Sequence, residues 1–490
     1  MSTYNRVVAA DENASLAPAV RARLATEMAE TFGLLTATLD MPTGLAWPTG
    51  YSPGTVVLSQ PLTGGSPVAT TTSGAEELFD AASTARSAPA NQYYVATTGN
   101  DTTGAGSYES PWRTVNKAIA AANASGSPAT IKVMPGIYAR GSGPSTVPTV
   151  DTAFIAYGGR VVTGSFDFPA SPTLDGTYTH TYKWALANIE RVLDIKNPNK
   201  FGHYADLKSV PTPALVNVTP DSYCLSTGTI YVRRADGLAP SSTNTYVTRV
   251  GVYNFSFPAH VNVFIGGSVA GDGWDVIGGT YGTIRALISP APGSDKVLAS
   301  KASTYRYAGG GVSTGSRSVS VDGWRGLAVF EDCDASASVT DGFNCHDTAG
   351  GGGVHMMTIN CSAYNNGTVG DQNSCNAWTL HETVKGIDIA GLFNVANGGV
   401  VRNIDTSSAW LAGTVASDDF GDVHHSGAVP PSAIRTDHSA VIWADRVLAS
   451  QPLAASRPWT AVDTSVIHRR NCWPVPQRDV VAGTATVDSY

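Results

Sequence analysis

Residues 93–138, YYVATTGNDTTGAGSYESPWRTVNKAIAAANASGSPATIKVMPGIY, decide the fold of this chain. Residues 93–95 predict a short strand, and Thr98-Gly99-Asn100-Asp101 predicts the turn after it. Ser110-Pro111 predicts a helix start, with Ser as the N-cap and Pro in the first position. Residues 131–133 predict a second strand, which ends at residues 135–138. The apolar face of the helix is formed by Trp112, Val115, Ile119 and Ala122.

This order of strand, turn, capping helix, strand and Pro-Gly-x-Tyr resembles the opening of right-handed parallel β-helix proteins of the pectate-lyase-like kind. In those proteins the short helix closes the open end of the solenoid. The resemblance implies an all-β chain built around a right-handed parallel β-helix (β-solenoid). Other parts of the sequence predict a short N-terminal helix, an inserted small β module and a C-terminal cap.

A repeat further along the chain supports a solenoid. Similar strand-and-turn units carry Cys333, Cys361 and Gly391 at intervals of 28 and 30 residues. Such a period fits β-solenoid coils with loops inserted at the turns. Cys333 and Cys361 are therefore expected to be neighbours in an internal ladder. The six cysteines show no zinc-type spacing and are expected to be buried thiols rather than disulfides.

Composition excludes several classes of protein. Of the 490 residues, 51 are Gly and 28 are Pro, and only 14% are charged, against about 25% in an average soluble domain. A coiled coil or a disordered chain does not have this composition. The net charge of −8 argues against a basic surface that binds nucleic acid. No apolar stretch is long enough to insert into a membrane, and residues 1–32 lack the apolar core of a signal peptide.

The chain divides into four predicted regions. Residues 1–36 form an N-terminal helical segment, with an apolar stripe over 15–32, and residues 37–92 form a linker rich in Gly, Pro, Ser and Thr with a few short strands. Residues 93–410 form the β-helix, interrupted by an insertion at about 196–240. Residues 411–490 form a C-terminal cap or oligomerisation region.

Two similar polar stretches on successive repeats are the candidate active site. Asp341–Asp347 ends in His346-Asp347, and Gly370–Glu382 ends in His381-Glu382. Because stacked coils lie about 4.8 Å apart, Asp347 and Glu382 could face each other like the carboxyl pair of a retaining glycosidase, one as nucleophile and one as general acid. His346 and His381 could orient them or contact a sugar. Further candidates are Asp341 and Asp371 as acidic groups, Trp378 as a sugar-stacking platform, and His355, Gln372 and Asn373 as substrate contacts.

Three alternatives stay open for these residues. They could form a structural polar ladder or contact a receptor, since such ladders satisfy turn backbone groups. They could also supply oxygen ligands to calcium, although no metal or other cofactor is required. A lyase mechanism is disfavoured because no Lys or Arg lies between Arg325 and Lys385 to act as base or to neutralise a uronate.

The first residues, MSTYNRVVAADENASLAPAVRARLA, resemble the start of minor tail proteins from siphophages that infect actinobacteria. The resemblance implies attachment to other tail proteins through the N-terminal segment, a homotrimer, and a location in the virion tail. It leads to the hypothesis of a tail protein that binds host cell-envelope polysaccharide during adsorption. The alternative hypothesis is a tail-borne polysaccharide depolymerase, a glycoside hydrolase rather than a lyase, that uses Asp347 and Glu382.

Overall fold

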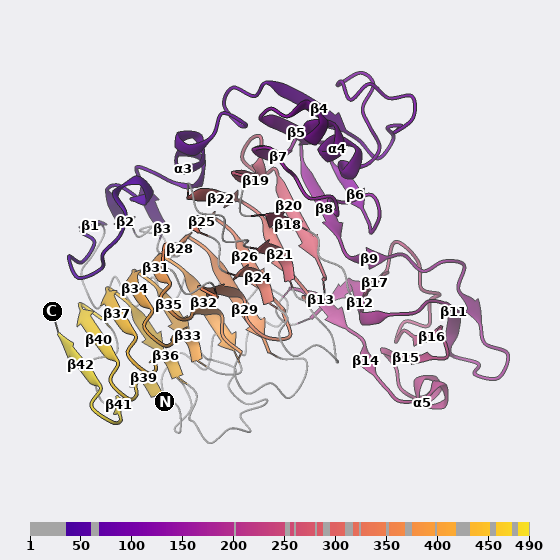
Figure 1. The fold of residues 1–490 in the computed structure, drawn as a ribbon. Coiled ribbons are helices and arrows are strands. Elements are labelled where there is room, and N and C mark those ends of the chain that lie inside the picture. Colours follow the sequence, from indigo (N-terminus) through magenta and orange to yellow (C-terminus); the bar gives the residue numbers. More distant parts are fainter. Residues whose placement is uncertain are drawn as a thin grey trace.

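The fold is a right-handed parallel β-helix with a small β module inserted near its N-terminal end (Figure 1). The computed structural model describes residues 36–59, 68–199, 202–249, 255–258, 261–279, 282–287, 295–308, 317–322, 325–348, 352–367, 375–396, 399–417, 432–450, 457–472 and 479–489. The helix predicted over 15–32 lies outside these residues. Among the helices that are described, none has the length and apolar character needed to cross a membrane.

Three sheets, whose strands all pair in parallel, form the walls of the β-helix in the described part of the chain. The long sheet contains β4 (Asn91–Val95), β5 (Ala129–Val133), β7 (Thr152–Ala156), β19 (Val263–Gly267), β22 (Lys296–Lys301), β25 (Gly326–Glu331), β28 (Val354–Ile359), β31 (Lys385–Ile389), β34 (Ser408–Ala412), β37 (Val441–Asp445), β40 (Val466–Arg470) and β42 (Thr486–Ser489). The second sheet contains β6 (Gly136–Tyr138), β8 (Arg160–Gly164), β20 (Gly273–Ile277), β23 (Thr304–Arg306), β26 (Asp334–Ser336), β29 (Ser362–Asn366), β32 (Leu392–Ala396), β35 (Val415–Ser417) and β38 (Leu448–Ser450). The third sheet contains β18 (Phe255–Pro258), β21 (Gly282–Leu287), β24 (Arg317–Asp322), β27 (Phe343–His346), β30 (Trp378–Leu380), β33 (Gly399–Asn403), β36 (Ser432–Thr436), β39 (Arg457–Ala461) and β41 (Val480–Val481).

The predicted repeat landmarks occupy equivalent positions. Cys333, Cys361 and Gly391 each stand directly before a strand of the second sheet, and those strands pair with one another in the order β26, β29, β32. Cys333 and Cys361 are buried neighbours inside the solenoid, and no cysteine forms a disulfide. The predicted neighbourhood of Cys333 and Cys361 is confirmed, and five of the six cysteines are buried as predicted, whereas Cys472 is half-buried.

The long sheet is apolar on both faces. Side chains alternate along each strand, so Ala328 and Phe330 of β25 join the interior while Leu327 and Val329 point outward. The outward set is covered by residues of the segment predicted as a linker, in which β1 (Thr36–Leu39), β2 (Val56–Ser59) and β3 (Val68–Thr71) form an antiparallel sheet. A 3-10 turn (Thr49–Tyr51) and helix α3 (Ala75–Ala82) belong to the same segment, which lies along one side of the β-helix (Figure 1). The described part of residues 37–92 is thus folded and packed.

The capping helix begins later than its sequence predicts. Helix α4 runs from Val115 to Ser125, and its N-cap is Thr114, whose hydroxyl accepts the Lys117 N–H at 3.2 Å. Trp112 instead forms an isolated parallel bridge with Val95, the last residue of β4. Its N–H donates to the Tyr94 carbonyl and its carbonyl accepts the Ala96 N–H, which keeps residues 110–113 out of the helix. Helix α4 covers the N-terminal end of the solenoid (Figure 1), in agreement with the predicted capping role.

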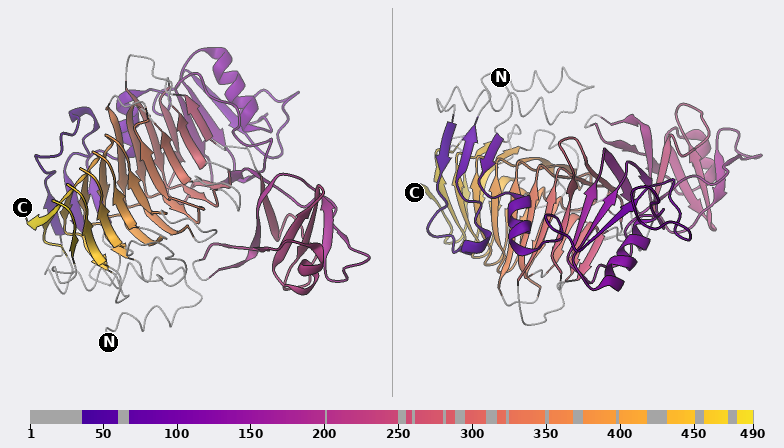
Figure 2. Two further views of the ribbon diagram at one scale, coloured as in Figure 1. Left: turned by 60° about the horizontal axis from the view of Figure 1, so that its bottom comes forward. Right: turned by 90° about the horizontal axis from the view of Figure 1, so that it is seen from above.

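The insertion is larger than predicted. It spans β9 (Phe166–Asp167) to β17 (Thr245–Arg249) and stands off the side of the β-helix (Figure 2). One sheet of this module contains β10 (Thr173–Leu174), β11 (Tyr182–Ala185), β16 (Thr229–Arg233), β15 (Ser222–Ser226) and β14 (Lys208–Ser209), next to helix α5 (Pro213–Val218). The other contains β13 (Tyr204–Asp206), β12 (Ile189–Pro198), β17 and β9. Strands β15 and β16 pair as an antiparallel hairpin.

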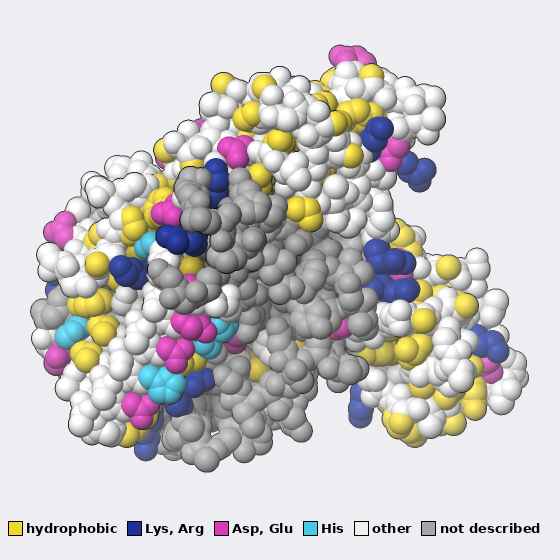
Figure 3. Space-filling view, viewed as in Figure 1, with side chains coloured by type: hydrophobic (Ala, Val, Ile, Leu, Met, Phe, Trp, Pro, Cys, Tyr) yellow, Lys and Arg dark blue, Asp and Glu magenta, His cyan; other side chains and the backbone are white. Residues whose placement is uncertain are grey.

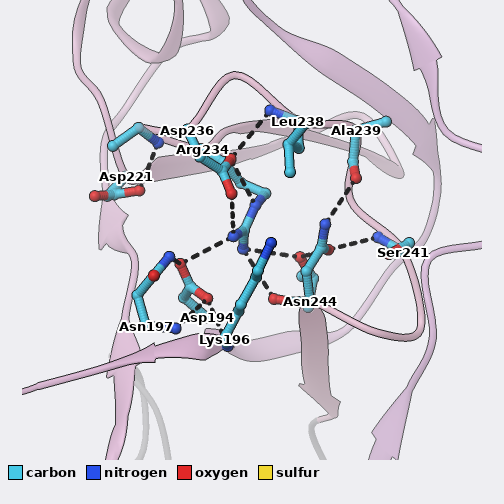
Figure 4. A network of polar contacts seen from close by, with 12 residues as sticks. Asp194, Lys196, Asn197, Asp221, Arg234, Asp236, Leu238, Ala239, Ser241 and Asn244 are labelled. Atoms are coloured by element: carbon cyan, nitrogen blue, oxygen red, sulfur yellow. Dashed lines mark hydrogen bonds and ion pairs between the residues drawn. The ribbon is translucent and has the colours of Figure 1, made fainter.

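A buried charge network joins the two sheets of the module (Figure 4). The Arg234 guanidinium, fully buried, contacts Asp194 of β12 at 3.1 Å and Asp236 at 2.8 Å, and donates to the Asn244 carbonyl at 2.8 Å. These partners satisfy a charge that would otherwise be very unfavourable in the interior. The module therefore has an internal polar centre of its own.

The region predicted as a separate C-terminal cap continues the solenoid. Strands β34 to β42 add regular parallel pairs to the long sheet up to Ser489. The intervals between equivalent turns in this half are irregular, at 23, 33 and 25 residues, because the loops between strands differ in length. That irregularity hid the repeat in the sequence.

The module docks on the β-helix through a buried histidine. The His203 ring stacks on Tyr364 of β29, with centroids 4.5 Å apart, and Tyr204 donates its N–H to the Tyr307 hydroxyl at 2.6 Å. Arg191 of the module donates to the Ala337 carbonyl at 2.5 Å. Burial, with added repulsion from Arg306 and Arg191, lowers the pKa of His203 well below its usual range.

Acidification should therefore destabilise this interface. Below the ordinary histidine pKa of about 6.5, the unfolded state binds a proton that the folded state excludes, so the free energy of unfolding falls as the pH falls. We expect a loss of up to about 1.4 kcal/mol per pH unit, measured as urea midpoints between about pH 7.5 and pH 5. His203→Phe should keep the stack and remove this dependence, whereas His180→Phe, at an exposed site, should not. An unchanged pH profile in His203→Phe would contradict the assignment.

Candidate functional site

One edge of the β-helix carries a row of turn residues that the coil register brings together. The residue directly after β27 and the residues two positions after β30, β33, β36 and β39 stack in successive coils, because the strands before them pair residue for residue. We call this set the turn row; its members are Asp347, Glu382, Asp405, His438 and Asp463. Figure 3 shows acidic and histidine side chains gathered in a row on this face.

Four of the five members of the turn row share a backbone conformation. The φ angles of Glu382, Asp405, His438 and Asp463 lie between 52° and 66°, in the left-handed region, and Gly483 continues the row at 73°. Non-glycine residues adopt this region only where surrounding bonds hold them there. The residue after each of these is Thr or Ser, so the sequence signal for the row is an acidic residue, His or Gly followed by Thr or Ser before a strand.

Side chains of the row bond from coil to coil. Glu382 accepts the Asp347 N–H at 2.9 Å, Asp405 accepts the Glu382 N–H at 3.1 Å, and Asp463 accepts the His438 N–H at 3.2 Å. Asp405 also contacts the His438 ring at 2.9 Å. These bonds satisfy turn N–H groups, as expected for a polar ladder.

The predicted carboxyl pair differs in exposure. Asp347 is buried, 2% exposed, and its carboxylate accepts the Gly352 N–H at 2.8 Å and the Thr383 hydroxyl. The Glu382 side chain is 37% exposed and lies 3.1 Å from His346 Nδ1. The catalytic roles of Asp347 and Glu382 stay predictions, but Asp347 is held within the turn by protein partners.

His346 and His381 come together as predicted. Cys345 of β27 pairs with Leu380 of β30, so the two histidines that follow lie in adjacent coils. Their rings stack at a centroid distance of 3.9 Å and an angle of 11°. Glu382 lies beside them.

Other predicted site residues lie away from this surface. Trp378 is fully buried in the core beside Phe393, so it cannot act as a sugar platform. Period-two alternation in β30 directs it inward. Asp341 is buried as well, and it accepts the Asn376 N–H at 2.7 Å and the Asn344 amide at 2.6 Å.

His355 is covered by the N-terminal segment. Its ring lies 5.1 Å from Trp47 and 5.6 Å from Tyr51, its Nδ1 faces the Gly326 carbonyl at 3.2 Å, and burial lowers its pKa. The predicted role in substrate contact is therefore wrong, because residues some 300 positions away in the sequence pack over it. Asp371, Gln372 and Asn373 lie outside the described residues.

A neighbouring acidic position is neutralised by arginine. Burial would raise the pKa of Asp437, but hydrogen bonds from Arg435 and the charge of Arg402 lower it overall. The Arg435 Nη2 and Arg402 Nε atoms lie 2.5 and 2.9 Å from its carboxylate. Asp437 is thus a buried ion-paired group rather than a ligand site.

A second candidate surface was missed by the sequence reasoning. Tyr94 of β4, Tyr108 and Tyr157 surround one another edge to face, with centroids 5.5, 5.9 and 6.4 Å apart, and Tyr108 is 54% exposed. Lys132 of β5 lies 4.8 Å from the Tyr157 centroid, and Gln92 donates to the Tyr94 hydroxyl at 2.6 Å. We call the three rings the tyrosine cluster. The sequence could have indicated this surface. Successive side chains of a strand point to opposite faces of the sheet, so Tyr94 points outward where Tyr93 points inward.

Comparisons with known proteins bear on the fold only. Residues 97–151, which include Tyr108, match a family model described as "Protein of unknown function (DUF1565)". The curated proteins include no match to this chain. Among solved structures, one titled "Glycoside hydrolase" is 8% identical at a TM-score of 0.46, covering 81% of this chain and 96% of that one.

Two further structures were compared. The pectate lyase Pel9A is 12% identical at a TM-score of 0.36, covering 83% of this chain and 79% of its own. The tailspike gp61 of Pseudomonas phage phi297 is 11% identical at a TM-score of 0.19, covering 76% and 69%. The fold assignment itself rests on the parallel strand order described above.

The turn row allows a direct test of its backbone conformation. Asp405→Val should lower the free energy of unfolding by about 1–3 kcal/mol more than Asp405→Gly, because a β-branched residue is strained in the left-handed region. Both variants lose the hydrogen bonds that the Asp405 carboxylate accepts. The difference between their free energies of unfolding therefore measures the backbone strain alone. Urea denaturation measures it. Equal stabilities would show that Asp405 does not require this conformation.

Proposed function

We propose that this chain is a virion tail protein that binds host cell-envelope polysaccharide without cleaving it. The observation that carries the binding proposal is the tyrosine cluster on the outside of the solenoid. The resemblance of residues 1–25 to minor tail proteins, noted from the sequence, supports the location in the tail. On the same basis, the N-terminal segment attaches to other tail proteins and the protein is a homotrimer.

The tyrosine cluster has the chemistry of a sugar-binding surface. A sugar ring presents C–H groups of partial positive charge, which pack on the electron-rich face of an aromatic ring. Lys132 and Gln92 lie at the same rings and can donate hydrogen bonds to sugar hydroxyls. An aromatic surface with a few polar donors at its edge is a common form of ligand site.

The strand framework presents these rings in a fixed arrangement. Tyr94 and Lys132 are direct partners in the β4–β5 pair, and the Tyr157 N–H donates to Val133 at 2.9 Å. Tyr108 lies on the loop before α4. The Tyr94 N–H donates a hydrogen bond of 2.8 Å to the Gly106 carbonyl of this loop and so holds the loop against β4. A surface fixed in this way loses little conformational entropy when it binds.

The geometry at the turn row supports binding over hydrolysis. A glycosidase pair needs two carboxyl groups that both reach the scissile bond. The Asp347 carboxylate is buried and bonded to Gly352 and Thr383, and Glu382 is bonded to His346 and the Asp347 N–H. Hydrolysis by this pair would require the buried Asp347 carboxylate to become accessible to the sugar.

Changes in the tyrosine cluster should weaken glycan binding. Tyr108→Ala and Tyr157→Ala should each raise the Kd for envelope polysaccharide about three- to tenfold, from the loss of about 0.5–1.5 kcal/mol of aromatic contact. Calorimetry or surface-immobilised polysaccharide measures the Kd. Tyr178→Ala, on the inserted module, is the matched control and should bind normally. Wild-type affinity in both cluster variants would refute the assignment of this surface.

The absence of cleavage is tested separately. Purified protein incubated with host envelope polysaccharide should release no reducing ends above background. Release that Asp347→Asn and Glu382→Gln both abolish, in variants with wild-type unfolding midpoints, would instead establish the hydrolase. Binding through the tyrosine cluster can be measured in the same samples, so the two outcomes are independent.

A further inference from the structure

Two imidazoles and one carboxylate meet at the turns after β27 and β30. One possible ligand atom from each of His346, His381 and Glu382 lies within 4.8 Å of the others. In the described part of the chain, no other three His, Cys, Asp or Glu residues come together in this way. The glycan proposal above makes no use of this group.

The two ring nitrogens of His346 have different surroundings. Its Nδ1 lies 3.1 and 3.2 Å from the two Glu382 oxygens, whereas its Nε2 is buried and has no hydrogen-bond partner among the described residues. An ion shared with Glu382 would therefore bind Nδ1, the nitrogen that faces this carboxylate, and the proton of the neutral ring would then be on Nε2.

We propose that His346, His381 and Glu382 form a binding site for a divalent transition-metal ion such as Zn²⁺. Two imidazole nitrogens and one carboxylate oxygen are the donor set of many three-ligand zinc sites, which keep a further position open. Calcium, considered from the sequence, prefers six to eight oxygen ligands and does not fit two imidazoles.

Binding requires a defined movement of the rings. Ligand atoms around a tetrahedral zinc ion lie about 3.4 Å apart, given metal–ligand bonds of about 2.1 Å. Two rings stacked in parallel cannot both point a lone pair at one ion, so at least one ring rotates about its Cβ–Cγ bond. The Glu382 backbone is fixed by its bond to Asp405, which leaves the side chains as the moving parts.

The ion would join two coils at one point. His346 belongs to the coil of β27, and His381 and Glu382 follow β30 in the next coil. An ion bound only by the folded state stabilises that state, so the thermal midpoint should rise with zinc concentration. The site includes Glu382 of the turn row but lies on different strands from the tyrosine cluster, so metal and glycan binding should be independent.

Titration of the full chain, freed of metal by chelation, tests the proposal. Calorimetry with Zn²⁺ should give one ion per chain, and Co²⁺ should give the visible absorption of a low-coordinate site. His381→Gln and His346→Gln should each weaken Zn²⁺ binding by at least about 10- to 100-fold, the loss that even outer-shell changes cause. His438→Gln, which alters the histidine of the turn row, is the matched control and should bind Zn²⁺ normally.

Three results would overturn the proposal. The first is that the wild-type chain does not bind Zn²⁺ at about 100 μM, a concentration far above the Kd of ordinary protein zinc sites. The second is that the two glutamine variants bind Zn²⁺ as tightly as the wild-type chain. The third is that the site binds calcium in place of zinc. If His346→Gln fails to fold, His381→Gln and the wild-type Co²⁺ spectrum still decide the question. Glycan affinity measured with and without Zn²⁺ separates this proposal from the preceding one.

Discussion

Parallel hydrogen bonding between successive coils is the constraint on which this structure depends. Each strand of the long sheet satisfies its backbone groups in the coils on either side, from β4 to β42. The bonding fixes a residue-for-residue register, so side chains at equivalent positions form columns about 4.8 Å apart. Inside the β-helix, the columns form the core. On its outside, the register alone places polar or aromatic groups next to one another.

The candidate sites are all consequences of these columns. Tyr94 and Lys132 are neighbours because β4 pairs with β5, and His346 and His381 are neighbours because β27 pairs with β30. The turn row adds a backbone requirement, since four of its five residues adopt left-handed φ values that glycine would adopt without strain. Acidic side chains at these positions compensate by accepting N–H groups of adjacent turns. Part of the chain's negative charge thus stabilises turns.

Much of the fold could be predicted from the sequence, because its signals are local. The strand, capping helix and second strand of residues 93–138 appear in order, and Cys333 and Cys361 are coil neighbours. The coils after residue 410 were missed because their loops differ in length. The side-chain direction of Trp378 depends on strand register, and the covering of His355 depends on Trp47 and Tyr51. Packing between residues so far apart in the chain leaves no local pattern in the sequence.

The structure of the protein bound to oligosaccharides from host envelope polysaccharide tests the central claim most directly. The account predicts intact sugar density against the Tyr94, Tyr108 and Tyr157 rings, with Lys132 or Gln92 bonded to sugar hydroxyls. Sugar bound elsewhere with this surface bare, or a cleaved product beside Asp347 and Glu382, would contradict it.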